Sequence, residues 1–283
     1  MPLTAQHFAE RISRLRADLG EQSRRVRTLI EGAFDAAFAR DTGAAQRVID
    51  LDEVIDRVDV DIEKACVALL TEACGSNATI TPDQVRMVLT IVKVNNELER
   101  IADAGVVVGE LVKPIAASTA PLPDTLRVIT NSVVGILRDA GLSLEKLDGR
   151  LAKVVLASED AVEAFKDAIV RDMTVQIAAG RLNADRAFLV QEITTQCEIM
   201  AGHCTNIAEQ ALYVATGKTS WVVIGVVLAA GGAFLASRVL PYVNGRFANW
   251  LDAFNPEVID RSGGSYQLVQ GIFGLAQGGL IGT

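Results

Sequence analysis

The stretch that decides the fold runs from residue 94 to residue 103 and reads Val94-Asn95-Asn96-Glu97-Leu98-Glu99-Arg100-Ile101-Ala102-Asp103. Its periodicity predicts an α-helix whose charged residues gather on one face. Glu99 and Asp103 lie outside that face, on a stripe of the helix that otherwise carries valines. Two carboxylates four residues apart repel each other, and partial burial raises the cost unless a cation or a hydrogen bond compensates. The pair therefore indicates either a metal site or, where the stripe reaches the surface, two solvated side chains.

Composition favours a helical, acidic protein. The chain has 283 residues, of which 50% are hydrophobic and only 5% aromatic, a usage that favours helices over strands. The net charge is −8, and residues 219–283 hold equal numbers of basic and acidic side chains, so residues 1–218 carry the whole acidic excess. An acidic domain without a basic tract argues against nucleic acid and fits a cation or a basic protein partner.

Long amphipathic patterns organise the first three quarters of the chain. They predict six helices, at about 3–39, 44–73, 81–112, 124–148, 150–179 and 184–216. Thr81 is expected to cap the third helix, with Pro82 at its first position, and Gly149 is expected to separate the fourth from the fifth. A proline-rich linker at 114–123 leaves three helices on either side. The sequence therefore predicts an all-α fold of two antiparallel three-helix bundles, 1–113 and 124–218.

The last part of the chain has a different composition. Residues 219–237 contain no charge and are long enough to cross a bilayer, which predicts a transmembrane helix within 219–243, with a buried apolar helix as the alternative. Its small residues would permit a homodimer. The chain opens without a signal-peptide pattern, which places the bundles on the cytoplasmic side of the inner membrane. Residues 244–283 are rich in glycine and their fold stays open.

Motifs for catalysis are scarce. The sequence shows no nucleophile–base set, no glycine loop for phosphates and no Cys/His cluster, and His7 and His203 fit no Glu-x-x-His spacing. A di-metal carboxylate enzyme is therefore the least favoured class. The four cysteines form no Cys-x-x-Cys pair, and their helical surroundings predict buried, reduced thiols.

The order of these features resembles the PhoU family of phosphate-regulatory proteins. The resemblance covers residues 1–218 and is carried by three motifs, Asp52-Glu53-Val54-Ile55-Asp56, Glu97-Leu98-Glu99-Arg100-Ile101-Ala102-Asp103 and Glu198-Ile199-Met200-Ala201-Gly202-His203-Cys204-Thr205-Asn206-Ile207-Ala208-Glu209. It implies two three-helix bundles side by side and no catalytic activity. It also implies that carboxylates on two helices of each bundle can hold iron, zinc or another divalent metal.

Carried onto this sequence, the resemblance gives a first metal site in the first bundle. Its ligands would be Asp52, Asp56, Glu99 and Asp103. Four carboxylates from facing helices suit a hard or borderline cation, and their spacing does not select among metals.

The second bundle departs from the family pattern. Its counterpart ligands are Glu159, Glu163 and Glu198, but Gly202 stands at the fourth position and has no donor atom. A second site is therefore expected to be weaker or empty. The next residue, His203, projects about 100° around the helix axis from Gly202. It is therefore expected to be structural rather than a ligand.

The function that the resemblance implies is regulatory. Proteins of this family damp phosphate uptake and phosphate-starvation signalling by contacting a phosphate transporter and a sensor histidine kinase. The predicted membrane segment departs from the family, whose usual member ends near Lys218. The alternative is therefore an accessory or gating subunit, or a fragment, of a sodium–phosphate type transporter.

Overall fold

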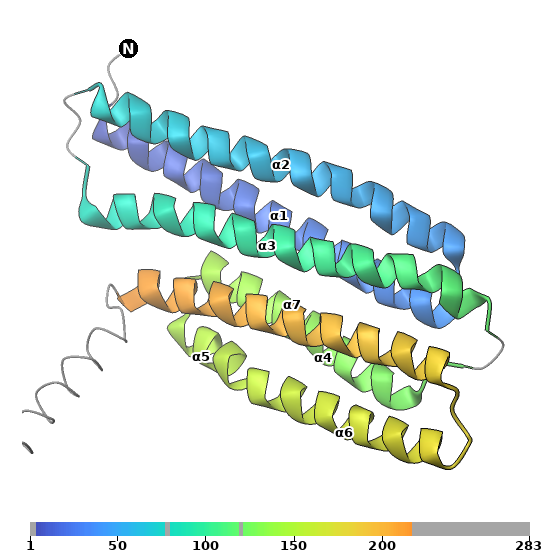
Figure 1. The fold of residues 1–283 in the computed structure, drawn as a ribbon. Helices are drawn as coiled ribbons and strands as arrows, with labels where there is room; N and C mark the ends of the chain where they lie inside the picture. Colours follow the sequence, from blue (N-terminus) through green and yellow to red (C-terminus); the bar gives the residue numbers. More distant parts are fainter. Residues whose placement is uncertain (1–3, 77–79, 119–120, 217–283) are drawn as a thin grey trace, which may run out of the picture. The chain divides into compact units, whose positions relative to one another are not determined.

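Helices make up the fold of the described chain. The computed structural model describes residues 4–76, 80–118 and 121–216, and these contain helices and no strand. The helices are α1 (Ala5–Ala39), α2 (Thr42–Cys74), α3 (Pro82–Ala116), α4 (Asp124–Glu145), α5 (Gly149–Ala157), α6 (Glu159–Ala178) and α7 (Ala184–Thr216). Figure 1 shows α1, α2 and α3 in one bundle and α4 to α7 in a second beside it. The expected all-α class and paired bundles are confirmed.

Helix α3 lies at the centre of the packing. It packs against α1 and α2 in its own bundle and against α7 of the other bundle. Its fully buried aliphatic side chains follow the helix from end to end and include Val88, Ile91, Val94, Leu98, Ile101, Val108 and Val112. Each contributes about 1.5–3 kcal/mol by leaving water. Because one helix serves both cores, the two bundles share a continuous apolar interior.

Several helices begin where the sequence signals place them. The Thr81 side chain accepts from the Gln84 backbone N–H, and the Gln84 side chain accepts from the Thr81 N–H, forming a capping box with Pro82 in the first turn. The predicted start of this helix is confirmed. Asp41 caps α2 in a similar way, because its Oδ1 accepts from two backbone N–H groups at 2.9 Å.

The single helix expected at 150–179 is wrong. Two helices, α5 and α6, meet at Ser158, whose Oγ donates to the Val154 carbonyl at 2.8 Å. A serine that bonds back to a carbonyl four residues earlier competes with the helix hydrogen bonds, and such a bond accompanies the break here. The preceding break is also displaced: α4 ends at Glu145, Leu147 adopts a φ of 52°, and Gly149 is the first residue of α5.

Two further expectations are corrected at helix ends. Pro114 lies inside α3 rather than at the start of a linker, since a proline near the last turn removes only one helical hydrogen bond. Cys74 is exposed because it is the last residue of α2, whereas Cys66, Cys197 and Cys204 are buried as expected. All four thiols are free.

The predicted transmembrane segment at 219–243 and the glycine-rich residues 244–283 lie outside the described residues. Among the helices that are described, none has the length and apolar character needed to span a bilayer.

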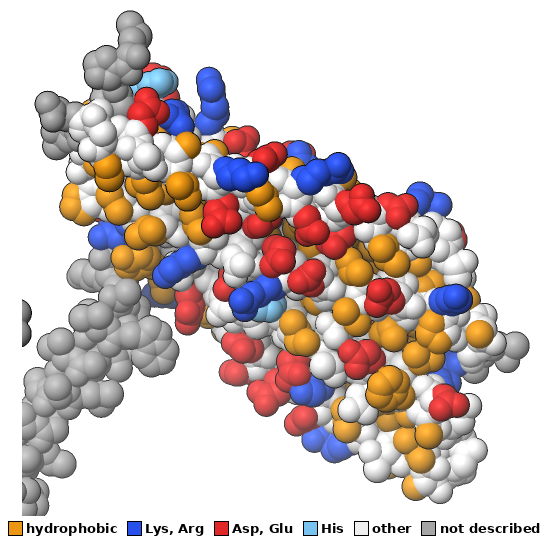
Figure 2. Space-filling view, turned by 45° about the horizontal axis from the view of Figure 1, so that its top comes forward, with side chains coloured by type: hydrophobic (Ala, Val, Ile, Leu, Met, Phe, Trp, Pro, Cys, Tyr) orange, Lys and Arg blue, Asp and Glu red, His pale blue; other side chains and the backbone are white. Residues whose placement is uncertain are grey.

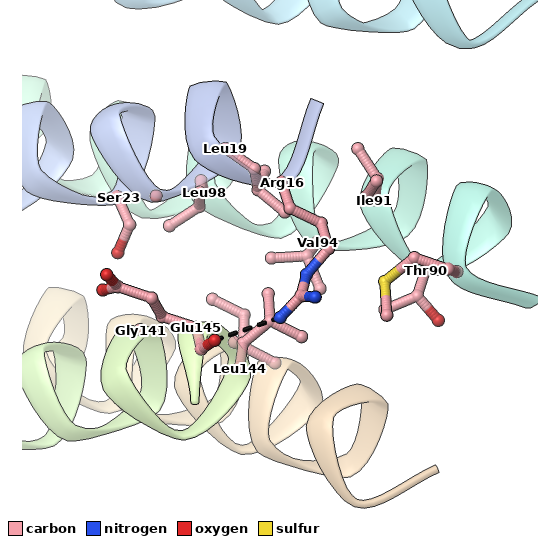
Figure 3. A pocket seen from close by; sticks show the side chains of 13 residues that line it. Arg16, Leu19, Ser23, Thr90, Ile91, Val94, Leu98, Gly141, Leu144 and Glu145 are labelled. Carbon is pink, nitrogen blue, oxygen red and sulfur yellow. Dashed lines mark hydrogen bonds between the residues drawn. The ribbon is translucent and has the colours of Figure 1, made fainter. Parts of the chain in front are cut away.

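The seam between the bundles is closely packed. A Cβ added to Gly141 on α4 would lie 2.5 Å from the Ser23 Oγ on α1, so these helices approach more closely than a larger residue would allow. Beside this contact lies an apolar cavity of about 20 Å³, room for about one water molecule (Figure 3). Arg16 reaches across it from α1 and donates to the Glu145 carbonyl on α4 at 3.1 Å.

Substitutions at two glycines, Gly105 in the first bundle and Gly135 in the second, compare a tightly packed position with an open one. A Cβ at Gly105 would lie 2.4 Å from Leu29 Cδ2 and 2.5 Å from Ile30 Cδ1, and both side chains are fully buried. We expect Gly105→Ala to lower the free energy of unfolding by about 1–3 kcal/mol through overpacking. Gly135→Ala, where nothing lies within 4 Å, should raise it by about 0.5–1 kcal/mol. Urea unfolding followed by circular dichroism measures both, and equal effects would contradict the packing described.

Candidate functional site

Acidic side chains gather where α2 faces α3. Asp52, Asp56 and Asp59 follow one another on α2 at spacings of four and three, which places them on one side of the helix. Glu99 and Asp103 lie four apart on α3. In Figure 2 the molecule is turned so that α2 comes forward, and acidic side chains cluster in the middle of the visible face. The four ligands predicted for the first site therefore belong to one group of carboxylates.

The carboxylates of this group act on one another. Burial raises the pKa of Asp52 to about 6, and the charges of Asp56 and Asp103 add to the rise. Burial, followed by the charges of Asp103, Asp59 and Asp56, likewise raises the pKa of Glu99. The pKa of Asp103 is raised by burial and then by Asp56. Negative charge is thus concentrated here without enough basic side chains to balance it.

The arrangement of these side chains leaves an acceptor without a donor. Asp52 Oδ1 is buried and has no hydrogen-bond partner. Such an atom is normally paired, because leaving a buried polar group unsatisfied is costly. The carboxylates do not, however, close around a common point: across the described ranges, no three His, Cys, Asp or Glu side chains are grouped tightly enough to hold a metal ion. The charge and the donor chemistry fit a cation, and the coordination sphere is not formed.

One pair at this site was missed by the sequence reasoning. Asn95 on α3 is buried, and its Nδ2 donates to the Asp59 side chain at 2.6 Å and to the Asp59 carbonyl at 2.9 Å. This contact fixes the α2 and α3 backbones beside the carboxylates. Burial raises the pKa of Asp59, followed by the charges of Glu63 and Asp56. The sequence indicates this pair through one feature, an amide side chain within a helix stripe that is otherwise apolar.

The second bundle offers a different arrangement. Glu159 and Glu163 are exposed on α6, and Glu198 on α7 is paired with Lys166, whose Nζ lies 2.5 Å from Glu198 Oε2. Lys166 stands three residues after Glu163, on the same side of α6. An ammonium group therefore already neutralises one of the three expected ligands.

A polar contact joins the bundles next to the first site. Glu97 on α3 accepts at one oxygen, Oε2, from Asn206 Nδ2 at 3.0 Å, and the same oxygen lies 2.7 Å from His203 Nδ1. The Glu97 and His203 side chains are only 19% and 18% exposed. The sequence predicts Glu97 on the polar face of its helix, and the structure places that side chain in the interface with α7. His203 thus has a partner in the opposite bundle.

Comparison with known proteins gives the chain a family. The PhoU domain matches residues 19–112 and 126–211, one copy in each bundle. The phosphate-specific transport system accessory protein PhoU homolog 1 of Thermotoga maritima is 23% identical over 216 residues, 75% of this chain and 90% of that protein. The crystal structure of PhoU from Pseudomonas aeruginosa has the same fold, with a TM-score of 0.69 at 22% identity over 75% of this chain and all of that one.

A second likeness is local. The peptidoglycan glycosyltransferase RodA of Mycobacterium tuberculosis is 43% identical over 72 residues, which are 25% of this chain and 14% of that enzyme. A match to 14% of the enzyme carries no information about whether this chain has the enzyme's activity. The matches to the PhoU domain, by contrast, span most of both bundles, and the chain belongs to the PhoU family.

Proposed function

We propose that this protein is a non-enzymatic regulator of phosphate transport. The observation that carries the proposal is the match of the PhoU domain to both bundles, together with relatives named as accessory proteins of a phosphate-specific transport system. The near-complete coverage of the Thermotoga relative supports carrying over its role as a whole. The protein would damp phosphate uptake and phosphate-starvation signalling through contacts with a phosphate transporter and a sensor histidine kinase.

The place of action that we propose is the inner face of the cytoplasmic membrane. Residues 219–243 would anchor the bundles there, and tethering raises the effective concentration of a weak binder near a membrane partner. The acidic face over α2 and α3 suits a basic surface on such a partner. The alternative, a gating subunit of a transporter, requires specific contacts by the anchor, which a generic membrane anchor would not replace.

We further propose that the first bundle binds a divalent metal, such as iron, zinc or manganese. Asp52, Asp56, Glu99 and Asp103 would hold it, with the unpaired Asp52 Oδ1 as one donor. A bound cation would offset both burial and the mutual repulsion, which together raise the pKa values of Asp52, Glu99 and Asp103. The pairing of Glu198 with Lys166 supports a second bundle without a metal.

The pH dependence of stability should report the crowded carboxylates. The pKa of Asp52 is about 6 in the folded protein, above its ordinary value of 3.8, so the folded state binds the proton more tightly than the unfolded state. The resulting stabilisation is present below about pH 4 and is lost as the pH rises through 6. We expect the melting temperature of chelator-treated protein to fall over this window and to fall less in Asp52→Asn. The exposed neighbour substitution Glu53→Gln should leave the slope unchanged.

Metal addition should reveal which bundle binds. At a metal concentration a hundred times the dissociation constant, binding stabilises the folded state by about 2.7 kcal/mol, a rise of a few degrees in melting temperature. We expect Mn²⁺, Fe²⁺ or Zn²⁺ to produce this rise in the full chain and not in the double variant Asp52→Asn/Asp103→Asn. The matched variant Glu159→Gln/Glu163→Gln should respond like the wild type. An equal response from both double variants would contradict a site in the first bundle.

The cellular role is tested by phosphate accumulation. In a deletion strain grown with ample phosphate, we expect raised cellular phosphate and polyphosphate, and the full chain should reverse the rise. A version that ends at Lys218 reports the contribution of the predicted anchor. A version that carries an unrelated membrane helix should restore function if the segment is only a tether, and should fail if the protein is a transporter subunit. Unchanged phosphate and polyphosphate in the deletion strain would count against the regulatory role.

A further inference from the structure

The hollow between the end of α3 and the start of α7 lies away from the carboxylate group. Figure 1 shows these two helix ends at the same end of the bundles. The hollow is open, has a volume of about 510 Å³, and is lined by Ser118, Asn183, Asp185, Arg186, Phe188 and Leu189 among others. This volume is in the range of small-molecule sites. Nothing in the proposed regulatory role uses it.

Two guanidinium groups converge on one residue of this hollow. Arg40, just past the end of α1, donates from Nη1 to the Ser118 carbonyl at 2.9 Å. Arg186, in the first turn of α7, donates from Nη1 to the Ser118 hydroxyl at 3.1 Å. Burial lowers the pKa of Arg186, and the charge of Arg40 lowers it further. The two guanidinium groups therefore lie near each other at Ser118.

One nitrogen of the Arg186 guanidinium donates no hydrogen bond. This nitrogen, Nη2, is buried and has no hydrogen-bond partner. Within the part of the chain that the structure describes, Arg186 forms no ion pair with any carboxylate, including its exposed neighbour Asp185. An unpaired guanidinium nitrogen beside a hydroxyl is a combination suited to a phosphoryl or carboxylate oxygen. The positive end of the α7 dipole adds to the attraction, because Arg186 lies in its first turn.

The rest of the hollow is mixed in character, because Asn183 and Asp185 line it together with Phe188 and Leu189. Phe188 lies on the same helix two residues after Arg186, and its side chain is 63% exposed, more than any other large hydrophobic residue among those described. An aromatic ring left in water next to a charged donor offers a surface for an apolar or aromatic body. A bare inorganic ion would use the donor and leave this surface uncovered.

We propose that this hollow is a binding site for a small organic oxyanion, whose charged group meets Arg186 and Ser118 and whose apolar body lies on Phe188. The charged group is a phosphate monoester or a carboxylate, which share the chemistry that a guanidinium recognises. The site goes beyond the regulatory role, since neither the carboxylates of the first bundle nor a protein partner takes part.

Titration calorimetry of the full-length protein tests the site with three probes. Phenyl phosphate and benzoate carry an aromatic body on the two kinds of oxyanion, and inorganic phosphate carries none. We expect at least one aromatic probe to bind, and to bind more tightly than inorganic phosphate. Arg186→Gln should weaken that binding about tenfold or more, the effect of losing a charged hydrogen-bond donor. Phe188→Ala should weaken the aromatic probe several-fold and leave inorganic phosphate unchanged.

The control is Arg181→Gln, which removes the same charge from an exposed arginine five residues earlier and should change binding less than twofold. Arg186→Lys keeps the charge and should bind the probe with intermediate affinity, which distinguishes loss of recognition from a folding defect. Circular dichroism checks the fold of each variant. The proposal is overturned if neither aromatic probe binds, or if Arg186→Gln and Arg181→Gln have equal effects. Either result leaves the phosphate accumulation test untouched, so the two proposals fail separately.

Discussion

Burial of α3 on two sides is the constraint on which the rest of the structure depends. A helix that packs in one bundle needs one apolar stripe, but α3 contacts α1 and α2 on one side and α7 on another. Its sequence is accordingly apolar over much of its circumference, and a polar side chain that remains in the interior is costly unless it finds a partner. Asn95 finds Asp59, and Glu97 finds His203 and Asn206. These contacts fix how the helix is rotated between its neighbours.

The same helix explains why carboxylates can be crowded at the site. Apolar packing above and below holds α2 and α3 together, and the Asn95 amide ties their backbones, so repulsion among Asp52, Asp56 and Asp103 does not separate the helices. The result is a rigid support with unbalanced negative charge, which is the condition for binding a cation or a basic surface. In the second bundle a lysine from the same face supplies the positive charge, and that condition is absent.

Contact between the bundles extends well beyond the Glu97 group. Gly141 brings α4 against Ser23 of α1, and the Arg127 guanidinium lies 4.0 Å from the centre of the Phe38 ring across the same boundary. Contacts of these different kinds along the seam make the paired bundles one packed unit. For the regulatory role proposed above, such a unit would present its surfaces, the acidic face and the arginine-lined hollow, in one arrangement.

Local signals and periodicity were enough to predict most of the helices, and the resemblance carried by three motifs predicted the family. The capping box at Thr81 and the apolar stripes depend on neighbours in the chain, so the sequence by itself determined the all-α class and the paired bundles. The bend at Ser158 escaped prediction because a serine bonds either to water or back to its own helix, and sequence does not say which. Only the tertiary structure decided the partners of Glu97, Glu198 and Arg186, because each depends on a helix more than 30 residues away or on another bundle. A charged side chain looks the same in sequence whether it meets water, a lysine or a histidine, and the packing of distant helices makes that choice.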